Sequence, residues 1–215
     1  MGCGLHHKQM AIRQTPTDIP QLDLLGDAQA RPAEVHRLFL ALIPDESVRT
    51  RLTAVADALR FQCPELRARW INPARYHATL HFLGDHAMLR PDIVAAATAA
   101  ADSIRMAPFE WLLDHAAGFR GRQPPCVLRC SVVPEPLQQL WQELRRALLL
   151  SGQGRQLERT FTPHVTLAYS QSVLLQPMAI EPVSWRVEDI ALIHGVVGQP
   201  QQQVLGRWSL QGRPK

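Results

Sequence analysis

The sequence predicts an α+β fold that is built twice, and three observations support this prediction. Short apolar runs typical of strands alternate with segments that have helical periodicity. The expected order is strand, helix, strands and helix, followed by strands, helix and strands, which is typical of mixed α and β layers. The tetrapeptide His-x-Thr-Leu occurs once in each half, starting at His77 and at His164. We therefore expect two similar lobes, each with one His-x-Thr strand.

The individual elements follow from periodicity. HRLFLALIP (36–44) is a short apolar run that ends at Pro44, as expected for a buried strand. The next segment, 45–61, has apolar residues at helical spacing and acidic residues in its first turn. Two more helices are expected at 91–104 and 136–152, and the remaining strands at 68–71, 77–83, 109–116, 126–133, 164–170, 184–197 and 203–210.

The first part of the chain differs from the rest in composition. Residues 1–34 contain three prolines and little periodicity, so we expect a mobile N-terminal extension. A two-lobed domain is expected to span residues 35–212. No apolar run reaches the length of a membrane span, so we expect no membrane partner.

The four cysteines are too sparse for a disulfide scaffold. Cys126 and Cys130 would lie on one face of a strand, which is consistent with buried free thiols. Without a second pair of cysteines they do not form a tetrahedral zinc site. A reducing cytoplasm is the expected location.

The chain carries a net charge of +4, and most of its cations are arginines. The guanidinium group suits bidentate contacts with phosphate. The charge therefore favours an anionic ligand.

The two His-x-Thr segments place unusual side chains on one face of a strand. Since side chains alternate along a strand, one face of the first segment would hold His77, Thr79 and His81, and the other Ala78, Leu80 and Phe82. By the same alternation, the second segment would present His164, Thr166 and Ala168 on one face, and Val165, Leu167 and Tyr169 on the other. A solvent-exposed strand face usually carries Lys and Glu instead.

Two imidazoles that face each other can act as one acid and one base near neutral pH. The hydroxyls of Thr79 and Thr166 can donate hydrogen bonds to the non-bridging oxygens of a phosphoryl group. This set suits metal-free phosphodiester chemistry. The sequence alone leaves open which histidine is the acid.

Two other interpretations remain. His77 and His81 have the spacing of a helical zinc pair, but on a strand they lie two pleats apart and no Glu completes the motif. We therefore expect no metal ligands, and His81 is interpreted as a cation that lines the cleft or as a spare polar group. A non-catalytic module that binds RNA in the same cleft is the alternative to an enzyme.

HATLHFLG and RTFTPHVTLA resemble the paired signatures of the two-histidine phosphoesterase superfamily. They are most similar to the bacterial and archaeal RNA 2′,3′-cyclic phosphodiesterases, formerly called 2′-5′ RNA ligases. The resemblance extends from about residue 36 to residue 170 and is loose at both ends.

The resemblance implies a bilobal α+β fold in which two antiparallel sheets form a V-shaped cleft, with helices on their outer faces. It implies hydrolysis of an RNA or nucleotide 2′,3′-cyclic phosphate to the 2′-phosphomonoester, without a cofactor and by a monomer. His77 would be the general acid and His164 the general base. Thr79 and Thr166 would hold the phosphate.

Further roles also come from the resemblance. Arg159 would pair with phosphate and Phe161 would stack on a base; the alternatives are a solvated arginine and a core phenylalanine. Arg120 and Arg122 would form a basic rim for an RNA backbone.

The chain also departs from the family. His81 replaces a frequent Lys, and ALIHGVV (191–197) replaces a segment that tends to contain tyrosine. The substrate therefore stays open between a cyclic phosphate end, a 2′-5′-linked oligonucleotide and an ADP-ribose cyclic phosphate.

Overall fold

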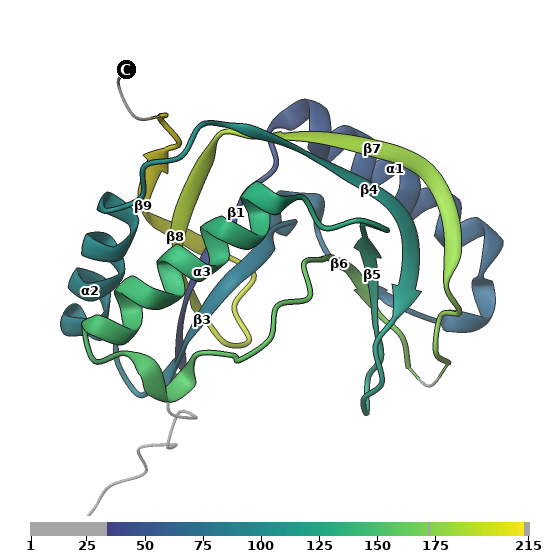
Figure 1. Cartoon of the computed structure of the whole chain (residues 1–215). Helices are drawn as coiled ribbons and strands as arrows, with labels where there is room; N and C mark the ends of the chain where they lie inside the picture. Colours follow the sequence, from purple (N-terminus) through teal and green to yellow (C-terminus); the bar gives the residue numbers. More distant parts are fainter. Residues whose placement is uncertain (1–33, 172, 213–215) are drawn as a thin grey trace, which may run out of the picture. The chain divides into compact units, whose positions relative to one another are not determined.

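The computed structural model describes residues 34–171 and 173–212. They form two sheets in which all paired strands are antiparallel (Figure 1). The first sheet has the order β3-β1-β8-β9, with β3 Ala78–His86, β1 His36–Leu42, β8 Asp189–Val196 and β9 Gln202–Ser209. The second sheet has the order β2-β6-β5-β4-β7, with β2 Arg69–Trp70, β6 Val165–Tyr169, β5 Pro125–Arg129, β4 Phe109–Gly118 and β7 Met178–Val187. The predicted fold class is confirmed.

Helices connect the strands in a repeated way. Helix α1 (Glu46–Gln62) leads from β1 to the segment before β3, and α3 (Glu135–Leu150) leads from β5 to the segment before β6. Each helix crosses to the other half: α1 packs on β7, whereas α3 packs on β3 and beside α2 (Pro91–Asp102). The crossing joins both halves in one continuous apolar core. Three short 3-10 turns complete the connections, at Pro64–Leu66, Pro73–Arg75 and Gly154–Gln156.

The helices bury the faces that their sequence periodicity predicts. Helix α1 begins where the Asp45 carboxylate accepts a hydrogen bond from the Val48 N–H at 2.7 Å, which satisfies a free donor of the first turn. The apolar face of α3 is buried, and Gly152, with φ of +82°, ends this helix. The buried residues of α3 are Leu137, Leu140, Trp141, Leu144 and Leu148.

Two predicted strands have other limits in the structure. Residues 184–197 belong to two strands, β7 and β8, which are separated at Glu188. The strand predicted at 126–133 ends at Arg129, because Ser131 donates two hydrogen bonds to the Asp114 carboxylate and turns the chain away from the sheet. Cys126 and Cys130 are buried free thiols, as predicted.

The predicted extension lies almost entirely outside the described residues, so its mobility and the predicted 35–212 domain boundaries remain predictions. In the described part of the chain, no helix combines the length and the apolar character needed to cross a membrane.

Candidate active site

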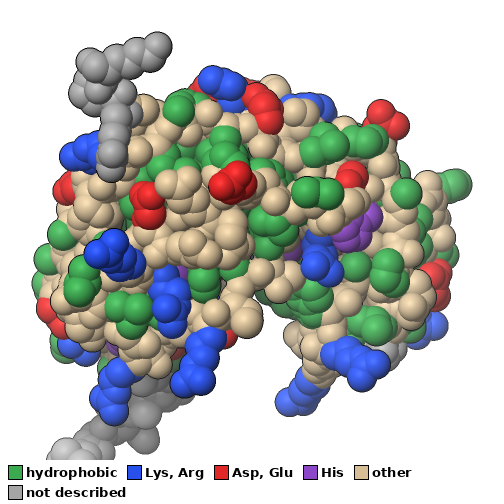
Figure 2. Space-filling model, viewed as in Figure 1, with side chains coloured by type: hydrophobic (Ala, Val, Ile, Leu, Met, Phe, Trp, Pro, Cys, Tyr) green, Lys and Arg blue, Asp and Glu red, His purple; other side chains and the backbone are tan. Residues whose placement is uncertain are grey.

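A cavity of about 840 Å³ opens between the two sheets, and Figure 2 shows the hollow on the surface. Residues of β1, β3, β6 and the β8–β9 connection line it, together with the segment from Arg69 to His77. It contains His77 and Thr79 from one half and His164 and Thr166 from the other. Among the described residues that line it there is no Asp or Glu, so the cavity favours an anionic ligand.

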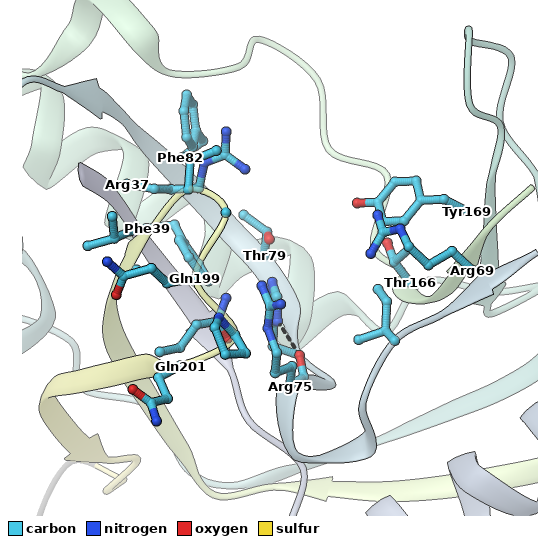
Figure 3. A pocket seen from close by; sticks show the side chains of 18 of the residues that line it. Arg37, Phe39, Arg69, Arg75, Thr79, Phe82, Thr166, Tyr169, Gln199 and Gln201 are labelled. Atoms are coloured by element: carbon cyan, nitrogen blue, oxygen red, sulfur yellow. Dashed lines mark hydrogen bonds between the residues drawn. The ribbon is translucent and has the colours of Figure 1, made fainter. Parts of the chain in front are cut away.

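The two histidines are held in the same way. Each precedes a strand, and its Nδ1 lies 2.7 Å from the carbonyl oxygen of the residue two positions earlier, Arg75 for His77 and Thr162 for His164. The dashed line at Arg75 in Figure 3 marks the first of these contacts. Because a carbonyl only accepts, Nδ1–H must be the donor in both rings. The neutral imidazole therefore keeps its lone pair on Nε2, where it is free to accept a proton.

Aromatic rings pack against both imidazoles. The ring of Phe39 lies 4.9 Å from that of His77, and the ring of Phe119 lies edge-on, 5.0 Å from that of His164. Burial lowers the pKa of both histidines, partly offset by their carbonyl hydrogen bonds. The cations Arg75, for His77, and Arg129, for His164, lower the pKa further. Both imidazoles are therefore neutral in the free protein at neutral pH, and an anion bound between them would favour protonation of one.

A β-bulge in β3 changes the predicted alternation of side chains. Thr79 pairs with Ala41 and His81 pairs with Leu40, so Leu80 is an extra residue without an opposite partner. The bulge turns His81 into the core and returns Phe82 to the cavity. The prediction that His81 shares the face of Thr79, with Phe82 on the opposite face, is therefore wrong.

The second strand, β6, has a bulge at the corresponding position. Thr166 pairs with Val127 and Ala168 with Cys126, which leaves Leu167 as the extra residue. As a result Tyr169, not Ala168, lines the cavity beside Thr166. The predicted faces of these two residues are also wrong, for the same reason.

His81 has a different environment from the one predicted. It is only 2% exposed, its Nε2–H donates to the carbonyl of Trp141 at 2.9 Å, and its ring stacks on the indole at 5.2 Å. Burial lowers the pKa of His81 to about 4, so it is neutral at neutral pH. The interpretation of His81 as a cation that lines the cleft is wrong. His77 lines the cavity whereas His81 is buried in the core, which is incompatible with a chelating pair.

An arginine lies over each of the two aromatic rings that the bulges turn toward the cavity. Arg37 lies over the Phe82 ring at 5.6 Å, and Arg69 lies over the Tyr169 ring at 5.1 Å. Figure 3 shows these two pairs on opposite sides of the cavity.

The two arginines differ in their ion pairs. The guanidinium of Arg37 donates to both carboxylate oxygens of Asp85, at 2.8 and 2.7 Å. Arg69 has no carboxylate partner among the described residues. Arg75, which lines the cavity beside His77, has no carboxylate partner among the described residues either, so Arg69 and Arg75 both leave positive charge uncompensated in the cavity.

Sequence reasoning did not identify Arg37 or Arg69. Both lie within predicted strands, HRLFLAL and ARWI, where a charged side chain among apolar neighbours is a usable signal. Their position in the cavity depends on pairing between distant strands, which that signal does not give.

The two predicted substrate-binding residues do not line the cavity. Phe161 stacks on Trp141, with ring centroids 5.3 Å apart and planes 8° apart, and it packs against the core. Arg159 is exposed elsewhere on the surface. Arg120 and Arg122 are exposed in the β4–β5 connection, close in sequence to Gln123, which does line the cavity. The functional roles of these residues remain predictions.

The crossed halves and the paired His and Thr side chains define the class of two-histidine phosphoesterases. A family model of the 2′-5′ RNA ligase superfamily matches residues 43–199, and the chain belongs to this superfamily.

Solved structures agree with this assignment. The chain is similar to LigT of E. coli in its apo form, with 27% sequence identity, a TM-score of 0.65, and coverage of 83% of this chain and 99% of LigT. It is similar to a protein of Thermus thermophilus, with 26% identity, a TM-score of 0.65, and coverage of 83% of this chain and 100% of that protein. LigT has also been solved with 3′-AMP, at 28% identity and a TM-score of 0.65, over 82% of this chain and 99% of LigT. A comparison with curated protein sequences gives no significant match.

Proposed function

We propose that this protein hydrolyses the 2′,3′-cyclic phosphate end of RNA to a 2′-phosphomonoester. The observation that carries the proposal is the pair of imidazoles, each with Nδ1–H bound to a carbonyl and each lining the same cavity. The solved complexes of LigT with 3′-AMP and with phosphate support a nucleotide ligand.

In the proposed reaction a water molecule attacks phosphorus and the bond from phosphorus to O3′ breaks. Nε2 of His164 takes a proton from the water as the new P–O bond forms. Nε2–H of His77 gives a proton to the departing O3′, so the product is a 2′-phosphate with a free 3′-hydroxyl. The assignment of acid and base follows the family resemblance, because the two rings have equivalent hydrogen bonds.

Three side chains would stabilise the phosphorane-like transition state. The hydroxyls of Thr79 and Thr166 would donate to the non-bridging oxygens. The guanidinium of Arg69 would neutralise the charge that develops there, since no carboxylate competes for it among the described residues.

The complete site lies within one chain, which supports action as a monomer. The buried free thiols of Cys126 and Cys130 support a reducing compartment, and we place the protein in the cytoplasm.

The test is incubation of the purified protein with an RNA that ends in a 2′,3′-cyclic phosphate, in the presence of EDTA. The expected product is the 2′-phosphomonoester, identified by its resistance to enzymes that require a 3′-phosphate. Loss of turnover in EDTA, or a 3′-phosphate product, would refute the proposal. Binding of the RNA without any product would favour the non-catalytic module, and a panel with 2′-5′-linked oligonucleotides and ADP-ribose cyclic phosphate separates the substrate alternatives.

A further inference from the structure

The β8–β9 hairpin forms one rim of the cavity, and its side chains have no role in the reaction described above. The connection between the two strands lines the cavity from Gly195 to Gln202. Gly198 adopts a φ of +88° in the turn, a conformation that glycine reaches without strain. Three amide side chains of this rim line the cavity, those of Gln199, Gln201 and Gln202.

The hairpin is held in place at its base. The Val197 N–H donates to the Val35 carbonyl at 2.9 Å, and the His36 and His194 imidazoles are joined through Nδ1 and Nε2, also at 2.9 Å. These contacts tie the hairpin to strand β1 and to the residue that precedes it. The base of the hairpin is therefore fixed to β1, and the amides project from the turn that this base supports.

The wall on this side is mostly apolar, and Arg37, which lies over Phe82, donates to both carboxylate oxygens of Asp85. Phe39 and Phe82 line the cavity there and pack with Ala41, Ala191 and Ile193 of the sheet. Figure 3 shows Gln199 and Gln201 on the same side as Phe39, across the cavity from Arg69 and Tyr169. Both glutamines are exposed, so their amides are accessible to a ligand. An apolar surface bordered by a few hydrogen-bond donors and acceptors is typical of a site that binds a flat ring with polar atoms along its edge.

We propose that the hairpin forms a nucleobase subsite and that Gln199 and Gln201 favour adenine. This inference rests on the proposed function, because the phosphate is placed between His77 and His164. The base then extends toward the hairpin, where an amide can donate to N7 of adenine and accept from its N6 amino group. The corresponding edge of guanine offers two acceptors, which suit arginine or lysine. The hairpin rim from Gly195 to Gln202 carries neither, and Arg37, which pairs with Gly195 across the sheet, already donates to both carboxylate oxygens of Asp85.

The experiment compares kcat/KM for the 2′,3′-cyclic phosphates of adenosine, guanosine and uridine. The wild-type protein is expected to prefer adenosine by about tenfold, the discrimination typical of one bidentate amide contact. The double variant Gln199→Met and Gln201→Met keeps the length of both side chains but removes their hydrogen bonds, and it is expected to lose this preference. Gln142→Met, an exposed substitution on α3 outside the cavity, is the matched control and keeps the preference. Equal kcat/KM for the three bases, or a preference that survives in the double variant, would overturn the inference.

A binding measurement separates this inference from the proposed function. If no cyclic phosphate is hydrolysed, the proposed function fails, but calorimetry with adenosine 2′-monophosphate and uridine 2′-monophosphate still decides the subsite. Tighter binding of the adenosine compound that is lost in the double variant supports the subsite. Equal affinities for the two compounds refute it.

Discussion

The strands that follow His77 and His164 share one design in detail. In both, Nδ1 of the histidine is bound to the carbonyl two residues earlier, and the extra residue of a bulge comes directly after the threonine. In both, the bulge brings an aromatic residue to the cavity, and an arginine from another strand covers its ring. The two imidazoles and the residues around them are therefore arranged equivalently in the two halves.

The surroundings of the two strands differ in charge. Arg37 is neutralised by Asp85, whereas Arg69 faces the cavity without a carboxylate partner among the described residues. The residue after the bulge also differs, because the buried His81 corresponds to Ala168. The proposed acid–base pair is therefore symmetric, whereas of the two arginines that cover aromatic rings only Arg69 keeps its charge free for the proposed phosphate; Arg75, beside His77, also lacks a carboxylate partner among the described residues.

The largest expected effect tests the two equivalent histidines. His77→Ala and His164→Ala should each lower kcat/KM by about 10²–10⁴-fold, because each removes one partner of the proton transfers. The double variant should have nearly the same kcat/KM as the less active of the two single variants, since the two residues act as a unit. Steady-state hydrolysis of a cyclic-ended RNA measures this. His86→Ala, at the end of the same strand β3 but outside the cavity, is the control. Near-normal turnover in either single variant would remove that histidine from the mechanism.

The next largest effect tests the difference in charge between Arg69 and Arg37. Arg69→Met should lower kcat/KM by about a hundredfold, the loss expected for a donor that stabilises transition-state charge. Arg37→Met should cost less than about tenfold, because its charge is already satisfied by Asp85. Circular dichroism of both variants checks that they are folded. A larger loss for Arg37→Met would show that Arg37, and not Arg69, supplies the charge that acts on the phosphate.

A smaller effect is expected at the threonines. Thr79→Val and Thr166→Val keep the side-chain shape but remove the hydroxyl, and each should lower kcat by about tenfold through one lost hydrogen bond to a charged oxygen. If binding of inorganic phosphate and kcat are both unchanged in either variant, that hydroxyl does not contact the phosphoryl group.

Replacement of His81 should have the smallest effect on turnover. Its main effect should be on the stability of the protein. The pKa of His81 is about 4 in the folded protein and about 6.5 when unfolded, so the unfolded chain binds a proton first as the pH falls. The contribution to stability is present above about pH 6.5 and is lost toward pH 4, by up to about 3 kcal/mol. Chemical denaturation of the wild type and of His81→Leu across this range measures it. A pH dependence that is identical in the two proteins would contradict the buried neutral state of His81.

The simple alternation of side chains predicted part of this site correctly. It placed Thr79 with His77, and Thr166 with His164, because the chain is regular up to each threonine. It failed one residue later, since a bulge depends on which residue of the neighbouring strand is opposite, and the local sequence does not contain that information.

Residues near the motifs in sequence were also misleading guides to the cavity. Phe161 lies three positions before His164, yet its ring stacks on Trp141 of helix α3. Arg37 lies far from His77 in sequence, yet β1 pairs with β3 and brings both into the same cavity. Only the pairing of strands and the crossing of helices determine such neighbours.

The pH dependence of kcat/KM tests the central claim most directly, namely that each half contributes one imidazole to an acid–base pair. Burial lowers the pKa of both free imidazoles, so the wild-type profile should be a bell with its optimum below about pH 6.5. His164→Ala should lose the fall in rate at low pH, and His77→Ala the fall at high pH. A flat wild-type profile between about pH 5 and 8, or single variants that both keep the complete bell, would contradict the claim.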